Sequence, residues 1–405
     1  MTPAPGKWRA LALLAAAELL AMGLWFSASA VAPALSTHWE LTGAQAAWLT
    51  MAVQLGFVTG ALLSALLNVP DLLAPRRVIA FGAWIGAGVN ALVPLLGLSF
   101  ALAVVARFVT GMMLAAVYPP GMKIIATWTR KDRGLAIGIL VGALTVGSAS
   151  PHLFRAFGGI TAWQPVMYLA SALAALGGVL AWRFGELGPY RAPTPRFEWR
   201  YMAHALTDRP LRRANGGYLG HMWELYAMWT WIPLFLGYAY REAGVPSAEV
   251  KASLAAFGAI GAGGIGCVAA GWLADRWGRT RTTIASMVTS GACCVLIGLL
   301  VPLGPWVVTA VALIWGFAIV ADSAQFSASI SELADPGYVG TQLTTQTSMG
   351  FLLTIASIQL IPLLVDAVGW RWAFAFLAPG PAAGTLSMWL LKRSPDAARL
   401  AGGRG

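Results

Sequence analysis

The chain has 405 residues, of which 58% are hydrophobic and only 11% are charged, and its net charge is +11. Soluble domains carry about 25% charged residues, so this composition excludes an ordinary soluble domain. The basic balance does not indicate nucleic acid, because the charges lie in loops between apolar runs. The three cysteines and four histidines show neither a disulfide framework nor metal-ligand spacing. A membrane protein without metal or cofactor is therefore expected.

Twelve apolar runs follow one another along the chain. Each is long enough to cross a bilayer core of ~30 Å as a helix. The predicted spans are 10–34, 43–67, 77–97, 99–127, 134–157, 161–183, 214–239, 247–271, 282–301, 305–328, 341–364 and 371–391. The predicted fold class is thus an all-α membrane protein with twelve transmembrane helices.

Lysine and arginine are concentrated in alternate loops and at both ends of the chain. Positive charge marks the cytoplasmic loops of a membrane protein. The opposite loops carry four such residues, Arg155, Arg241, Lys251 and Arg371. Both termini are therefore predicted to be cytoplasmic, in a multi-pass protein of the cell (inner) membrane.

One long connector, residues 185–213, divides the chain near its middle. It contains Pro189, Pro193 and Pro195, and residues 196–209 are expected to form a short interfacial helix. The expected organisation is an N-terminal six-helix bundle at 1–184, a cytoplasmic linker at 185–213 and a C-terminal six-helix bundle at 214–405. Two pseudo-symmetric bundles are common in secondary transporters.

A short charged segment, residues 271–281, joins two of the apolar runs. Its glycines are expected to allow close helix approach at Gly271 and a turn with positive φ at Gly278. Residues 67–77, located 204 positions upstream, keep the acid and two basic residues but lack both glycines. The charged residues of the two copies are Asp275, Arg276, Arg279 and Arg281, and Asp71, Arg76 and Arg77.

Residues 271–281 closely resemble the G-x-L-a-D-r-x-G-r-k-r signature of the major facilitator superfamily, found between its eighth and ninth helices. The resemblance implies a secondary transporter of two six-helix halves, in which Asp275 belongs to a latch on the cytoplasmic gate. Residues 130–134 resemble the family's loop between helices four and five, where basic residues brace this gate. Arg130 and Arg133 are the matching residues.

Two charged residues are predicted deep within the first half. Glu18 lies ~13 Å into the first span at 1.5 Å per residue. Arg107 shares a helix face with Gly111 and Ala115, which favours close packing of a neighbour. This pattern resembles the fourth-helix motif of proton-coupled facilitators, which implies that Arg107 helps proton transfer. A structural ion pair is the alternative. We expect Glu18 and Arg107 to be close enough to pair.

The seventh predicted span contains a second buried acid. His221 and Glu224 lie three positions apart and so share a helix face. By the internal repeat, Glu224 corresponds to Glu18, as expected of acids lining a central cavity. Asp322 and Gln325 lie nearer the cytoplasmic end of their span and are expected at a gate or the mouth of the cavity.

These patterns predict a monomeric secondary active transporter of a small solute, coupled to protons. Glu18 and Glu224 are the candidate proton carriers, because burial favours the protonated form of a carboxyl group. No Walker loop, zincin helix or nucleophile elbow appears, so an enzyme is not expected. Two alternatives remain: a uniporter or anion exchanger in which Arg107 binds the solute, and a non-transporting receptor or scaffold on the same fold.

Overall fold

The structure is a computed structural model that describes residues 5–67, 69, 73–129, 133–158, 162–190 and 197–405. In these residues all regular structure is helical. The chain divides into two compact units. Unit 1 comprises Met1–Pro193 and Pro246–Phe257, and unit 2 comprises Thr194–Val245 and Gly258–Gly405. The division at residue 193 falls inside the connector 185–213.

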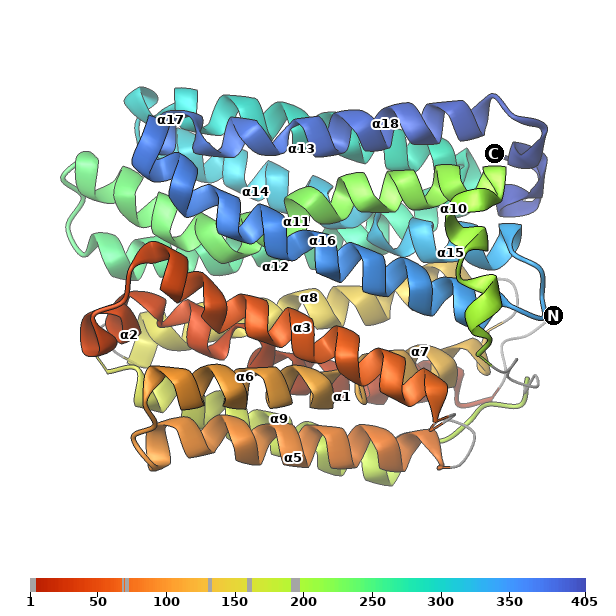
Figure 1. Cartoon of the computed structure of the whole chain (residues 1–405), viewed down its shortest axis with the longest axis horizontal. Helices are drawn as coiled ribbons and strands as arrows, with labels where there is room; N and C mark the ends of the chain where they lie inside the picture. The colour runs from red at the N-terminus through yellow and green to blue at the C-terminus, as the bar shows by residue number, and fades with distance from the viewer. Residues whose placement is uncertain (1–4, 68, 70–72, 130–132, 159–161, 191–196) are drawn as a thin grey trace. The chain divides into compact units, whose positions relative to one another are not determined.

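Unit 1 is a bundle of helices that run along one another (Figure 1). The most extensive contacts join α1 to α8 and α9, α5 to α9, and α3 to α6. The helices are α1 (Lys7–Ala30), α2 (Ala32–Trp39), α3 (Gly43–Leu66), α5 (Pro75–Leu95), α6 (Phe100–Leu114), α7 (Tyr118–Ala126), α8 (Arg133–Gly158) and α9 (Gln164–Phe184).

Glycines set the short distance between helices in this unit. A Cβ atom on Gly111 of α6 would lie 2.1 Å from the carbonyl oxygen of Val53 in α3. A Cβ atom on Gly56 of α3 would lie 1.9 Å from the carbonyl oxygen of Phe108. The backbones of α3 and α6 therefore meet at a distance that a larger residue would prevent, as is typical of membrane helix pairs. The close packing expected at Gly111 is confirmed.

The predicted fourth span is broken in two. α6 ends at Leu114 and α7 begins at Tyr118, with Pro119 and Pro120 in its first turn. Proline lacks the N–H that would continue a helix, but it fits the first helical turn. The prolines therefore account for the interruption between Leu114 and Tyr118.

Unit 2 is built around one long helix, α11 (Arg209–Glu242), which packs against α14, α15, α16 and α18. α12 (Ala248–Trp277) begins in unit 1 and belongs to unit 2 from Gly258 onward. The other members are η1 (Trp199–Tyr201), α10 (His204–Thr207), α13 (Arg279–Leu299), η2 (Val301–Leu303), α14 (Pro305–Ala321), α15 (Ser323–Leu333), α16 (Val339–Val368), α17 (Trp370–Ala373), η3 (Phe374–Leu377), α18 (Pro379–Lys392) and η4 (Pro395–Gly402).

The segment before α11 differs from the prediction. In place of one helix over 196–209, its described part forms the short elements η1 and α10. The side chain of Asp208 accepts a hydrogen bond of 3.3 Å from the amide of Leu211 and caps α11. Capping satisfies an amide that has no partner within the helix, so α11 begins at Arg209, five residues before the predicted span.

Eleven helical segments of the described residues are long and apolar enough to cross a membrane. The remaining predicted span, 214–239, lies within α11, which has 34 residues and begins with a basic turn. The chain is therefore a helical multi-pass membrane protein, and the structure is consistent with the predicted twelve helices.

Candidate functional site

Arg107 lies at the centre of a hydrogen-bonded cluster in unit 1. Its guanidinium donates to the carbonyl oxygens of Leu24 (2.9 Å), Trp25 and Leu49 (3.3 Å), to Oγ of Ser27 (3.1 Å) and to Oδ1 of Asn90 (3.0 Å). These acceptors belong to α1, α3 and α5. The side chain is only 1% exposed. Arg107 therefore joins three helices to α6, and the dipoles of these carbonyl, hydroxyl and amide groups stabilise its charge.

Asn90 extends this cluster to a fifth helix. Its side-chain amide donates to the carbonyl oxygen of Met167 (3.2 Å) and to Oγ of Ser171 (3.0 Å), both in α9. Its Oδ1 also accepts a hydrogen bond of 2.8 Å from Ser27. The polar groups are thus matched to one another, as buried polar groups usually are. Asn90 was not identified from the sequence, where its only signal was its polarity within an apolar span.

Glu18 of α1 lacks the hydrogen bonds that Arg107 and Asn90 make. Its side chain is fully buried, and neither carboxylate oxygen has a hydrogen-bond partner among the described residues. A Cβ atom on Gly121 would lie 2.0 Å from Oε1 of Glu18. The carboxyl group therefore packs against the first turn of α7, directly after the break in the fourth span.

The expected pair of Glu18 and Arg107 is not formed in this structure. Within the described residues, no ion pair joins these side chains, and the guanidinium contacts α1 at Leu24, Trp25 and Ser27 instead. These positions lie six to nine residues beyond Glu18, which is about 9–13 Å along a helix. The estimate from depth alone was wrong because helix phase and local carbonyl acceptors decide where an arginine is held.

Glu224 of α11 is buried but fully engaged. Its Oε2 accepts a hydrogen bond from Ser290 (3.0 Å), and its Oε1 accepts hydrogen bonds from Cys294 (3.2 Å) and from the indole of Trp315. The donors come from α13 and α14. The sequence pattern assigned Cys294 neither a disulfide nor a metal site, and it did not identify Ser290 or Trp315. The two acids related by the internal repeat therefore have different environments.

His221 does not share a partner with Glu224. Its Nδ1 lies 2.8 Å from Oδ1 of Asp322, at the junction of α14 and α15, and both side chains are almost fully buried. Nε2 of His221 has no hydrogen-bond partner among the described residues. Asp322 was expected at a gate or cavity mouth. In the structure it pairs with His221 of α11, and its role at a gate stays a prediction.

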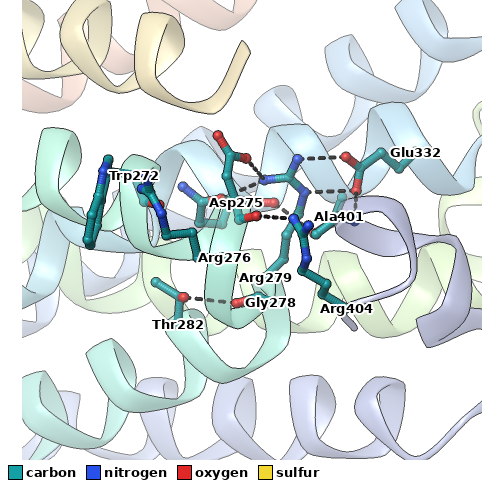
Figure 2. A network of polar contacts seen from close by, with 11 residues as sticks. Trp272, Asp275, Arg276, Gly278, Arg279, Thr282, Glu332, Ala401 and Arg404 are labelled. Atoms are coloured by element: carbon teal, nitrogen blue, oxygen red, sulfur yellow. Dashed lines mark hydrogen bonds and ion pairs between the residues drawn. The ribbon is translucent and has the colours of Figure 1, made fainter. Parts of the chain in front are cut away.

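The predicted gate segment forms a dense polar network (Figure 2). Arg279 donates to both carboxylate oxygens of Glu332, over 2.8 and 2.6 Å, and to Oε1 of Gln325 over 2.9 Å. Its Nη1 lies 3.7 Å from Oδ1 of Asp275. Gln325, which was expected at a gate or at the mouth of the cavity, thus contacts the arginine of this segment. Glu332, which the sequence analysis missed, makes the shorter contacts with Arg279.

The connection between α12 and α13 is a single residue, Gly278, with φ of 103°. The positive φ predicted there is confirmed, and glycine adopts it without steric cost. Gly271, by contrast, lies inside α12 and not at a helix end. Arg276 stacks on Trp272 at 3.8 Å from the ring centre, and Arg281 is exposed.

The N-terminal copy of the motif is only partly described. Arg76 makes an exposed ion pair with Glu186 (3.3 Å), and Arg77 lies 5.9 Å from the ring centre of Trp182. Asp71 and Arg130 lie outside the described residues. Arg133 is the first residue of α8. The described residues contain no group of three or more His, Cys, Asp or Glu side chains that could hold a metal ion.

Comparison with known proteins places these features in a family. The profile described as Major Facilitator Superfamily matches residues 14–358. No curated protein matches the chain. Among solved structures, a mutant of the nucleoside transporter NupG aligns with a TM-score of 0.69 and 13% identity, over 94% of this chain and 99% of that chain. At this identity the likeness concerns the fold. The chain belongs to the Major Facilitator Superfamily and is a membrane transporter.

Proposed function

We propose that the protein is a secondary active transporter that couples movement of a small solute to protons by alternating access. The observation that carries this proposal is the environment of Glu18. Its carboxyl group is fully buried, and neither oxygen has a hydrogen-bond partner among the described residues. An isolated buried carboxylate is very costly, so the neutral acid is favoured. Opening of the surrounding helices to water would remove that cost and release the proton.

Unit 2 supplies further ionisable groups for the same cycle. Asp322 and His221 form a buried pair of an acid and a histidine, 2.8 Å apart. Glu224 lies on the same helix as His221 but is bound by three donors. Glu18 is therefore the primary carrier in this proposal, the His221–Asp322 pair is secondary, and Glu224 has an organising role.

The contacts of Arg107 argue against the main alternative, a uniporter or anion exchanger that binds its solute at this residue. All three nitrogens of the guanidinium already donate to acceptors from α1, α3 and α5. A solute anion would have to displace several of these bonds. A receptor or scaffold without transport would give binding without solute flux, so flux distinguishes it from the proposal.

We propose that the protein lies in the inner membrane as a monomer, with both termini and residues 185–213 in the cytoplasm. The support is the concentration of basic residues in alternate loops. Alkaline phosphatase fused after Pro195 should be inactive, and the same enzyme fused after Arg241 should be active. The reverse pattern would contradict this orientation.

The solute class is the first quantity to measure. Purified protein is screened by thermal shift against cations, anions, sugars, amino acids and nucleosides. Nucleosides are included because the structurally similar NupG is described as a nucleoside transporter. A binding solute raises the midpoint of unfolding in proportion to the logarithm of its concentration.

The coupling test then compares wild type with Glu18→Gln in proteoliposomes. Gln mimics the neutral acid, so the variant should fold, bind the solute and exchange it, but should not accumulate it in a pH gradient. Glu242→Gln, an exposed acid at the end of α11, is the matched control and should accumulate solute like wild type. Accumulation by Glu18→Gln at the wild-type level would refute the role of Glu18.

A further inference from the structure

Residues 395–405 fold back from the end of α18 in a defined conformation. Leu400 is fully buried, and Ala401 adopts a positive φ of 48°. The amides of Gly403 and Arg404 both donate to the carbonyl oxygen of Leu400, over 3.0 and 3.1 Å. Gly403 itself has φ of 94°, which glycine tolerates. These bonds form a tight coil, which turns the chain toward the connection between α12 and α13.

This coil caps two helix ends at once. The side chain of Arg404 donates to the carbonyl oxygen of Asp275, in the last turn of α12 (Figure 2). The amide of Thr280, in the first turn of α13, donates to the carbonyl oxygen of Gly405 over 3.2 Å. Backbone groups at helix ends lack partners within the helix, and an arginine also complements the dipole at a helix C-terminus. Residues 404 and 405 thus stabilise both sides of Gly278.

Gly278 makes this contact possible. A Cβ atom at this position would lie 2.4 Å from the carbonyl oxygen of Gly405 and 2.5 Å from that of Arg404. Both distances are far below normal van der Waals contact. The glycine therefore serves two purposes. It permits the turn between α12 and α13, and its lack of a side chain leaves room for the backbone of residues 404 and 405.

The same segment also holds the end of α15. The amide of Ala401 donates to Oε2 of Glu332 over 3.0 Å, and Arg399 donates to the carbonyl oxygen of Leu333 over 2.5 Å. Glu332 is the carboxylate that binds Arg279. Residues 395–405, the α12–α13 connection and the end of α15 therefore form one continuous network within unit 2 (Figure 2).

We propose that residues 395–405 are an intramolecular brace that regulates transport by holding the α12–α13 connection against α15. A change of access that moves these elements apart must first break the bonds of Arg404 and Gly405. The brace therefore slows the change, and its release accelerates solute exchange. The effect on the transport rate rests on the alternating access proposed above. The stabilisation of the α12–α13 connection by residues 404 and 405 does not depend on it.

The structural test is hydrogen exchange on the full protein in lipid nanodiscs. Two variants weaken the brace: Arg404→Ala, and a chain ending at Gly402. Arg393→Ala is the matched control, because it also removes an exposed cation near the end of α18. The side chain of Arg393 stacks on Trp389, 3.7 Å from the ring centre, and so lies outside the brace. The amides of residues 279–283 should exchange about tenfold faster in both brace variants than in wild type. Their exchange rate in the control should equal that of wild type.

The functional test measures exchange of the solute identified by thermal shift. Both brace variants should exchange it at least about fivefold faster than wild type and Arg393→Ala. Unchanged amide exchange in both brace variants would overturn the brace, even if the protein transports solute. Faster amide exchange with an unchanged transport rate would overturn its regulatory role. Faster amide exchange in a protein that carries no solute would leave the structural brace intact and contradict the proposed function instead.

Discussion

Glu332 accepts two hydrogen bonds from Arg279, at 2.8 and 2.6 Å, whereas Asp275 of the family signature lies 3.7 Å from the same guanidinium. Two parallel bonds between arginine and a carboxylate are stronger and more directional than a single longer contact. The side chain of Arg279 is 7% exposed, so it depends on this partner. The stability of residues 271–281 is therefore expected to depend more on Glu332 than on Asp275.

Glu332→Gln should destabilise the protein by about 1–3 kcal/mol, the usual cost of losing hydrogen bonds to a charged group. Asp275→Asn should cost less than about 1 kcal/mol, because its contact is longer and partly exposed. Thermal unfolding followed with a thiol-reactive dye measures both, since Cys267, Cys293 and Cys294 are free and buried. A larger loss in Asp275→Asn than in Glu332→Gln would contradict this order.

Asp275→Asn should still change the distribution between access states, because Asp275 lies within the network that joins α12, α13 and α15. We expect normal folding together with altered accessibility of engineered cysteines from the two sides of the membrane. Accessibility equal to that of wild type would show that Asp275 is not part of a latch.

Arg107→Lys should be poorly tolerated even though it preserves the charge. Lysine has three donors on one nitrogen and cannot reproduce the planar fork that reaches acceptors on α1, α3 and α5. Each buried acceptor left without a partner costs about 1–3 kcal/mol. We expect low expression and a lower unfolding temperature. Asn90→Ala, which removes part of the same cluster, should produce a smaller loss in the same direction. Wild-type stability of Arg107→Lys would refute the structural role.

Gly121→Ala should alter proton coupling without unfolding the protein. The added Cβ would lie 2.0 Å from Oε1 of Glu18, but this atom is the end of a flexible side chain and can move. The pH dependence of solute accumulation should therefore shift. Gly88→Ala is the control, because a Cβ there meets nothing within 4 Å. Combination with Glu18→Asp, whose shorter side chain leaves room, should restore the wild-type profile. An unshifted profile in Gly121→Ala would count against Glu18 as the carrier.

Glu224→Gln should destabilise the protein, whereas Glu18→Gln should not. Glu224 accepts hydrogen bonds from Ser290, Cys294 and Trp315, so its loss should cost about 1–3 kcal/mol. Glu18 has no hydrogen-bond partner among the described residues, so Glu18→Gln should be neutral or stabilising. The midpoints of thermal unfolding at pH 7 test this. Equal destabilisation in both variants would mean that the two acids have equivalent environments.

The sequence by itself predicted the helical membrane fold and most span positions. The reason is that the thickness of the bilayer imposes a length of about 20 apolar residues on each spanning helix. Local chemistry also identified the turn at Gly278 and accounts for the break at Tyr118, since glycine and proline act on the backbone of their own neighbours. The signature at 271–281 could also be recognised from the sequence, because its residues are contiguous.

Only the tertiary structure decided which polar groups meet. Arg107 binds carbonyl groups up to 83 positions away, and Glu332 reaches Arg279 across 53 positions. Such pairings depend on the rotation of each helix about its axis and on its neighbours, which depth and spacing do not specify. The internal repeat in the sequence therefore predicted equivalent positions for Glu18 and Glu224. Packing separated them, because Ser290, Cys294 and Trp315 surround Glu224, whereas Gly121 faces Glu18 with no side chain that could donate to it.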